Sequence, residues 1–165
     1  MLLTIVQLVL SLAVAGTDST EMHLTFTTQI GGQDDLYVAG LTSGRIRQIT
    51  NHRAKDSHGV PSPDGTRLVF CSERNGWWKI WVAAADGSHA QQLTNPASGA
   101  DYHPDWSPDG EHIVYVSGGT GNGDIMVMNK DGSEATNISQ NTGRDNFPMW
   151  SPDGHWLAYA SDRDG

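Results

Sequence analysis

The chain has 165 residues, a formal net charge of −9, and 37% hydrophobic and 18% charged residues. This composition is typical of one soluble globular domain, and the negative charge argues against binding to nucleic-acid phosphates or to an anionic membrane surface. Of the 19 acidic residues, 15 are Asp. Because Asp favours turns and Glu favours helices, this excess indicates a chain rich in turns.

The chain begins with an apolar run over residues 2–15, which is interrupted only by Thr4, Gln7 and Ser11. The run is short for a membrane span, and Ala13-Val14-Ala15 has the small residues of a cleavage site. We therefore predict a signal peptide over residues 1–15, and a periplasmic or secreted mature chain without a membrane span. No Lys or Arg precedes the run, so a truncated signal, or a buried strand of one of the repeats described next, is the alternative.

A tetrapeptide, Ser-Pro-Asp-Gly, returns three times, beginning at Ser62, Ser107 and Ser151. Each copy is followed by a short apolar run, and after the first two copies come a glycine-bearing loop, a second apolar run and an Asp-Gly turn. An older copy over residues 20–52 keeps the apolar runs but lacks the tetrapeptide. A fixed period of 44 to 45 residues indicates one supersecondary unit repeated in tandem.

Each unit is predicted to contain four short antiparallel strands, because its apolar runs are alternating, β-branched and bounded by turn residues. Pro63 presets φ for a type I turn, Asp64 can bond the backbone beyond it, and Gly65 can take the positive φ that closes a hairpin. We therefore expect an all-β fold, a β-propeller of four-stranded blades. About three and a half blades are present, over residues 20–52, 56–96, 101–140 and, truncated, 145–165.

Two tryptophans, Trp106 and Trp150, stand just before the turn of their repeats, where an innermost strand would pack between neighbouring sheets. We expect both in the core. Pro61 occupies the equivalent place in the preceding repeat, so that blade should pack less well. The single Cys71 lies in the middle of a predicted strand and is expected to be a small core residue without a disulfide.

The Pro-x-Trp-Ser-Pro-Asp-Gly pattern, with its apolar strand and the Ser-Asp-Arg-Asp-Gly loop over residues 161–165, resembles the repeat of the TolB-like β-propeller family. The resemblance implies a six-bladed propeller when complete, so the chain is expected to be part of a longer protein. It also implies a place in the Tol–Pal system of the bacterial envelope. Similar repeats occur in prolyl-oligopeptidase-like enzymes, tricorn-like proteases and oligogalacturonate lyases.

Candidate binding residues cluster where each predicted first strand begins, because radial symmetry would bring these positions together at one mouth of a central channel. The set is Asp56, His58, Asp101, Tyr102, His103, Arg144, Asp145 and Asn146. Tyrosine, arginine and amide side chains suit a protein or peptide interface. The competing interpretation is structural, because residues that recur in every repeat usually hold the repeat together.

Catalytic motifs are absent from the sequence: there is no Gly-x-Ser-x-Gly elbow, His-Glu-x-x-His motif or phosphate loop. We therefore expect an exported protein- or peptide-binding module with no catalytic residue and no cofactor. Two enzyme alternatives stay open. In one, the propeller belongs to a prolyl-oligopeptidase-like hydrolase. In the other, suggested by the lyase resemblance, His58 and His103 hold a divalent metal for polysaccharide elimination.

Overall fold

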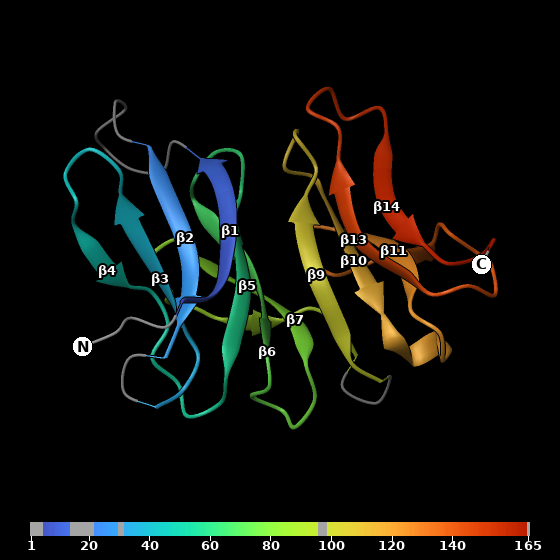
Figure 1. Ribbon diagram of the computed structural model, residues 1–165, viewed down its shortest axis with the longest axis horizontal. Helices are drawn as coiled ribbons and strands as arrows, with labels where there is room; N and C mark the ends of the chain where they lie inside the picture. The colour runs from blue at the N-terminus through green and yellow to red at the C-terminus, as the bar shows by residue number, and fades with distance from the viewer. Residues whose placement is uncertain (1–4, 14–21, 30–31, 96–98, 165) are drawn as a thin grey trace.

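The computed structural model describes residues 5–13, 22–29, 32–95 and 99–164, with no account of the side chains of residues 5–13. The described chain is built of antiparallel strands and one short 3₁₀ turn, η1 (Gly118–Thr120). None of its helices is long and apolar enough to cross a membrane. The strands form four successive sheets, and the two ends of the chain lie on opposite sides of the view in Figure 1.

Three sheets have four strands each, in simple up-and-down order. The first contains β1 (Ile5–Ala13), β2 (His23–Thr28), β3 (Asp35–Gly40) and β4 (Ile46–Gln48). The second contains β5 (Asp56–Pro61), β6 (Arg67–Ser72), β7 (Lys79–Ala84) and β8 (Gln91–Gln92). The third contains β9 (Asp101–Trp106), β10 (His112–Ser117), β11 (Asp124–Asn129) and β12 (Thr136–Asn137). The fourth pairs β13 (Asp145–Trp150) with β14 (Leu157–Ser161). The predicted all-β fold of four-stranded antiparallel blades is confirmed.

The apolar run at the start of the chain forms a strand in this structure. β1 pairs antiparallel with β2, from Ile5 opposite Thr28 to Ala13 opposite His23. It thereby supplies the first strand of the first sheet, as the alternative interpretation of this run expected. Residues 1–4 and 14–15 of the predicted signal peptide lie outside the described residues, and cleavage of this segment stays a prediction.

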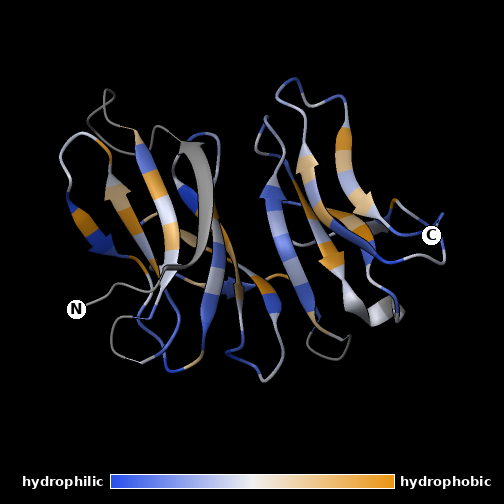
Figure 2. Ribbon diagram, viewed as in Figure 1, coloured by the Kyte–Doolittle hydropathy of each residue, from blue (hydrophilic) through white to orange (hydrophobic). Residues whose placement is uncertain are grey.

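The first strand of each sheet is the innermost one, since β1 contacts β5, β5 contacts β9, and β9 contacts β13. Figure 2 shows that β5 and β9 are largely hydrophilic, whereas the neighbouring strands of the same sheets are more hydrophobic. β6 and β10 are buried along almost their whole length, without alternation. Continuous burial is expected for a strand covered on both faces, so the core lies between sheets and the inner strands carry the polar groups.

The recurring tetrapeptide makes the same turn in each copy. In the first copy, Ser62 Oγ donates to Asp64 Oδ1 at 2.6 Å and accepts from Arg67 N at 3.0 Å, while Asp64 Oδ1 accepts from Thr66 N at 3.0 Å. Gly65 has a φ of 67° and donates to the Ser62 carbonyl at 2.8 Å. The copies at Ser107 and Ser151 repeat these bonds. The predicted turn mechanism is therefore confirmed.

The residues that the sequence predicts in the core are buried in the structure, with one partial exception. Trp106 is 5% exposed, and its Nε1 donates to the Val60 carbonyl at 3.0 Å. Cys71 is fully buried, and burial raises the pKa of its thiol. Trp150 packs against the third sheet but is only half-buried. Among the described residues, β14 is followed by no further sheet, so the last apolar positions have less to pack against.

The hairpin turns at the outer rim fit closely against the preceding sheet. A Cβ placed on Gly87 would lie 1.9 Å from the carbonyl oxygen of Ile49, and one placed on Gly132 would lie 3.0 Å from that of Leu93. Both glycines also have a positive φ, near 88°. Glycine is therefore required at these turns for two reasons, the backbone conformation and the approach of the neighbouring sheet.

Candidate functional site

Three of the inner strands share a backbone irregularity near their beginning. β5, β9 and β13 each have a register shift shortly after their second residue, which is a β-bulge. The third residue of each strand has a positive φ: 53° at His58, 50° at His103 and 53° at Phe147. A positive φ is uncommon for residues other than glycine, and strained backbone of this kind gathers at functional sites. The repeated bulge sets three ring side chains at equivalent places.

These three rings, which we call the inner rings (His58, His103 and Phe147), form a continuous row. The His58 and His103 rings meet edge to face, with centroids 4.5 Å apart. The His103 and Phe147 centroids are 4.6 Å apart, in a tilted arrangement. Such spacings are those of favourable ring pairs. The sequence therefore assembles one row of rings from residues about 45 positions apart.

The two histidines of the row are held in place by hydrogen bonds. His58 Nδ1 is bonded to Ser57 Oγ, and His103 Nδ1 lies 2.7 Å from Asn146 Oδ1. Burial, and secondarily the proximity of His103, lowers the pKa of His58 to about 4. Burial also lowers the pKa of His103, although the bond to Asn146 opposes that shift. Both imidazoles are therefore neutral near pH 7, so the row offers ring faces and hydrogen bonds rather than positive charge.

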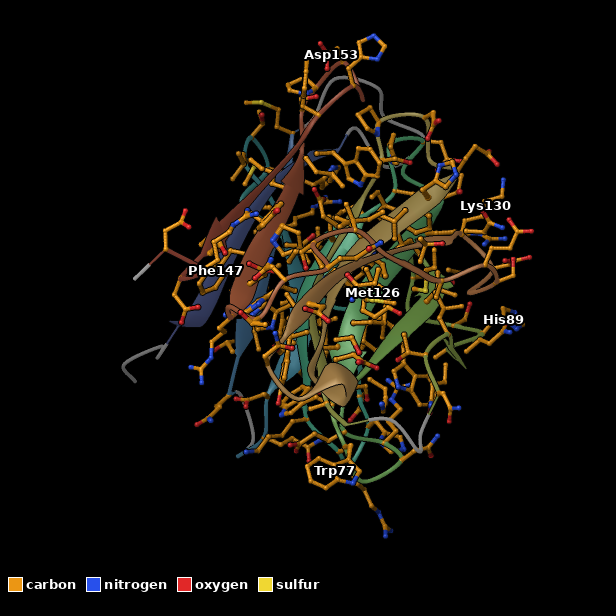
Figure 3. The ribbon with its side chains drawn as sticks, turned by 90° about the vertical axis from the view of Figure 1, so that its right-hand side faces the viewer. Trp77, His89, Met126, Lys130, Phe147 and Asp153 are labelled. Atoms are coloured by element: carbon orange, nitrogen blue, oxygen red, sulfur yellow. The ribbon has the colours of Figure 1, made fainter. Side chains whose placement is uncertain are left out.

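Phe147 is the open end of the row. It is 61% exposed, and Met149 on the same strand is 63% exposed. In Figure 3, Phe147 lies toward one side of the molecule, and the turn residues Lys130 and His89 lie on the opposite side. The view agrees with the sheet order, in which β13 is an inner strand and the two turns belong to the outer rim. An exposed aromatic ring backed by ordered rings is a feature of interface anchors.

A pocket of about 490 Å³ adjoins the row. Five of its lining residues are predicted site residues, and the rest of its wall comes from Val116 of β10 and from the glycine-rich loop that follows. The predicted residues in the lining are Tyr102, His103, Arg144, Asp145 and Asn146. Asn146 links this pocket to the row, because its Oδ1 also accepts from Phe147 N at 2.9 Å.

The three aspartates predicted at the channel mouth are buried and are held by neighbouring side chains. Asp56 pairs with Arg74 at 2.9 Å. Asp101 pairs with Lys79 at 3.1 Å and accepts from Ser117 Oγ at 2.9 Å. All three carboxylates are 0–1% exposed. These bonds tie the start of an inner strand to its surroundings, which agrees with the structural interpretation of the recurring aspartates.

Asp145 is held in a similar way. Its Oδ2 accepts from Asn141 Nδ2 at 2.7 Å. Burial pushes its pKa upward, but hydrogen bonds from serine and asparagine side chains outweigh burial and leave the pKa lowered. The predicted site residues thus form two groups. The three aspartates are buried and hold the inner strands to their surroundings, and the other residues lie around the inner rings and the pocket.

Phe147 and the glycine-rich loop over residues 118–123 were not among the predicted site residues. The signal for Phe147 was its position, because it is equivalent to His58 and His103 in the repeat. The loop contributes three glycines and Asn122 to the pocket, and none of these residue types indicated a binding site in the sequence.

The inner histidines do not make a metal site on their own. A divalent metal held by protein usually takes at least three side-chain ligands. Among the described residues no group of three His, Cys, Asp or Glu side chains is placed to hold one. The nearby carboxylates of Asp56 and Asp101 are committed to Arg74 and Lys79. The described residues therefore do not fit the metal that the lyase resemblance suggested.

Comparison with known proteins gives matches to TolB proteins and to a tricorn protease homolog. Residues 94–165 match the model of the TolB beta propeller domain. The chain is 34% identical over 84 residues to the Tol-Pal system protein TolB of Anaeromyxobacter dehalogenans, an alignment that covers 51% of this chain and 19% of that protein. It is also 33% identical over 63 residues to a tricorn protease homolog of Streptomyces coelicolor, covering 38% of this chain and 6% of that protein.

Among solved structures, a putative TolB from Agrobacterium tumefaciens superposes with a TM-score of 0.76 at 26% identity. The superposition covers 93% of this chain and 59% of that one. The chain thus spans about a fifth of the length of the curated TolB relative and little more than half of the solved structure. The sheets of this chain superpose on those of the solved Agrobacterium structure.

Proposed function

We propose that this chain, whose repeats are those of TolB-like β-propellers, is an exported protein-binding module of the cell envelope that grips a peptide segment at its inner rings. One relative, aligned over 84 residues, is a Tol-Pal system protein, so the natural candidate for the partner is a protein of that system. Export is supported by the apolar run with small residues at its end, over residues 2–15.

The observation that carries the binding proposal is the exposure of Phe147 beside ordered rings and a pocket. Its ring is 61% exposed although it stands on an inner strand, and His103 supports it at 4.6 Å. Large apolar side chains that are rigid and exposed act as anchors when a partner covers them. Arg144 and Asn146 at the adjoining pocket can bond the backbone or the carboxylates of a bound peptide.

The row of neutral imidazoles adds selectivity. Because His58 and His103 are uncharged near pH 7, they present polarised ring edges and faces without attracting acidic partners indiscriminately. The proposed contact is therefore an aromatic or aliphatic side chain of the partner on Phe147, with hydrogen bonds from its backbone to the pocket.

The test is the affinity of the natural full-length protein for the Pal protein of the same organism, measured by isothermal titration calorimetry. Phe147→Ala should weaken binding about tenfold or more, the loss typical of an anchor residue. Trp156→Ala is the matched control, because Trp156 is an aromatic residue, 74% exposed, in the connection between β13 and β14. Equal affinities of all three proteins, or no binding of Pal, would count against the proposal.

Export is tested separately by N-terminal sequencing of the protein from its own cells. A mature chain that begins at Gly16 supports export and removes β1 from the first sheet. A chain that keeps residues 5–13 retains that strand and argues against the predicted signal peptide. The binding measurement is independent of this result, because Phe147 lies in the fourth sheet.

A further inference from the structure

We call the packed space between two successive sheets a junction. At the first junction (first and second sheets) and the second junction (second and third sheets), equivalent positions carry different residues. At the junction of the second and third sheets, Trp106 packs into a buried cluster with Val69 and Val82, and Leu93 packs against the same cluster. The register shows which residues are equivalent in the first sheet, because Thr25 pairs with Val38 as Val69 pairs with Val82. Counting along the repeat places Ile49 at the position of Leu93 and Pro61 at the position of Trp106.

The residues at the first junction are smaller. Proline stands in place of the indole of Trp106, and threonine stands in place of Val69. The replacements leave a pocket of about 410 Å³ between the first two sheets. Its floor is formed by Thr25, Val38, Ile49, Pro61 and Leu68. The pocket therefore lies where an indole ring stands at the next junction.

Three arginines surround this pocket. Arg47 lies in β4, Arg45 lies in the loop just before β4, and Arg67 lies in β6. All three are exposed, and Arg47 Nη2 reaches the Ala85 carbonyl at 3.4 Å. Asp86 is the acidic residue in the lining. The ion pairs between described residues join Arg74, Lys79 and Lys130 to carboxylates, and none of these pairs uses an arginine of the pocket.

This concentration of positive charge is unusual for the chain. Only 10 residues are Lys or Arg, and the formal net charge is −9. Arginine side chains bind carboxylates through paired hydrogen bonds and stack on aromatic faces. A site with an apolar floor and an arginine rim recognises a group that is apolar at one end and anionic at the other.

We propose that the pocket between the first and second sheets binds an aromatic carboxylate with a ring the size of an indole, its ring on the apolar floor and its carboxylate at the arginine rim. The volume lies within the range of small-ligand pockets, about 300–1,000 Å³. The ring takes the space that Trp106 occupies at the next junction, and the three guanidinium groups outnumber the single carboxylate of Asp86. This site is separate from the inner rings, and the proposal does not depend on the proposed function.

The probe is N-acetyl-tryptophan, and binding to the full-length protein is measured by calorimetry. N-acetyl-tryptophanamide has the same ring without the charge, and N-acetyl-alanine has the charge without the ring. We expect the acid to bind about tenfold or more tightly than the amide, since hydrogen bonds to charged groups are the stronger ones, and we expect no measurable binding of N-acetyl-alanine. Equal binding of the acid and the amide overturns the role of the arginines.

The ligand can be a free metabolite or an acidic, tryptophan-bearing segment of a protein, which share this chemistry. A capped peptide with the sequence Asp-Asp-Trp-Asp distinguishes these sources. Tighter binding of the peptide than of N-acetyl-tryptophan assigns the site to a protein segment. Tighter binding of N-acetyl-tryptophan assigns it to a small molecule. Failure of both probes to bind overturns the proposal.

Substitutions locate the site. Arg47→Ala should weaken binding of N-acetyl-tryptophan about tenfold, whereas Arg163→Ala, at an exposed arginine in the turn after β14, should leave it unchanged. Pro61→Trp should abolish binding by placing an indole in the pocket. If that protein does not fold, Val38→Phe fills the pocket from the opposite wall. Unchanged affinity in a folded filling variant, or equal losses in the Arg47 and Arg163 variants, overturns the proposal.

Discussion

At the junction between the second and third sheets, the indole of Trp106 is 5% exposed and packs between Val69 and Val82, which are 0% and 7% exposed. At the junction between the first and second sheets, Pro61 stands at the same place, Val38 is half-buried, and a pocket of about 410 Å³ is left. The pairing register of the second and third strands is alike in the first and second sheets. The second junction also has a hollow of about 530 Å³, but it lies beside the turns and its lining is polar apart from Trp106 and Pro63. How far a pocket reaches into the apolar part of a junction is therefore decided by a few side chains and not by the backbone.

The largest change in the free energy of unfolding is expected at the second junction, where Trp106 fills the apolar space. Trp106→Ala should destabilise the protein by about 4 kcal/mol, because it removes a buried indole, leaves a cavity and deprives the Val60 carbonyl of its Nε1 donor. Urea unfolding measures the loss. Trp156→Ala, which removes an exposed ring, should cost less than about 0.5 kcal/mol. A similar small cost for both variants would show that Trp106 does not hold the second junction.

A pH effect of nearly the same size is expected at the inner end of the second junction, where His58 meets His103. The unfolded pKa of histidine is about 6.5, and that of folded His58 is about 4. Protonation therefore favours the unfolded chain. Stability is complete above pH 6.5 and falls by up to about 3 kcal/mol as the pH drops to 4.

The variant His58→Phe isolates this effect, because the chain itself places a phenylalanine, Phe147, at the equivalent position with the same backbone conformation. Urea unfolding of both proteins between pH 7 and pH 4 should show a smaller acid loss in the variant. The lowered pKa of His103 leaves some acid sensitivity in the variant, with the same sign. Parallel losses in the two proteins would exclude His58 as the titrating group.

An intermediate effect is expected from matched truncations at the two junctions. Leu68 and Ile113 are equivalent and are 1% and 0% exposed. Ile113→Ala should cost about 4 kcal/mol and Leu68→Ala about 2 kcal/mol, the upper and lower parts of the usual range, because Leu68 already lacks neighbours on its pocket side. The difference in unfolding free energy is the measurement. A larger cost at Leu68 would reverse the comparison.

The smallest effect is expected from filling the first junction. Pro61→Trp should stabilise the protein by about 1 kcal/mol, since the indole buries apolar surface but also loses rotamer freedom. Thermal and urea unfolding of the ligand-free protein test this. A variant that is markedly less stable would show that the first junction is shaped for proline and does not have the geometry of the second.

The sequence predicted the sheets well, because the period of the repeat and the Ser-Pro-Asp-Gly turn are local signals. Residues within five positions of Ser62 make all the bonds of that turn, so residue types alone were enough. The first strand was harder to assign. An apolar run ending in small residues suits both a leader and an innermost strand, and only the pairing of β1 with β2 places it in the sheet.

The candidate site was predicted less completely, because its partners are not repeated. Asp56 and Asp101 are equivalent, yet Asp56 is held by Arg74 from its own sheet's loop and Asp101 by Lys79 from the preceding sheet. No spacing rule connects these pairs. The grouping of His58 with His103 did follow from radial symmetry, but the bulge that turns both rings was not visible in residue types.

The close fit of Gly87 and Gly132 against the last strand of the preceding sheet has a consequence for the history of such chains. Each rim turn contacts the carbonyl of its immediate predecessor, and the same contact recurs one unit later. Duplication or loss of a whole unit in the gene would leave every remaining contact of this kind with a suitable neighbour. Proteins with different numbers of these sheets can therefore arise by recombination between repeats, without a change in any interface between sheets.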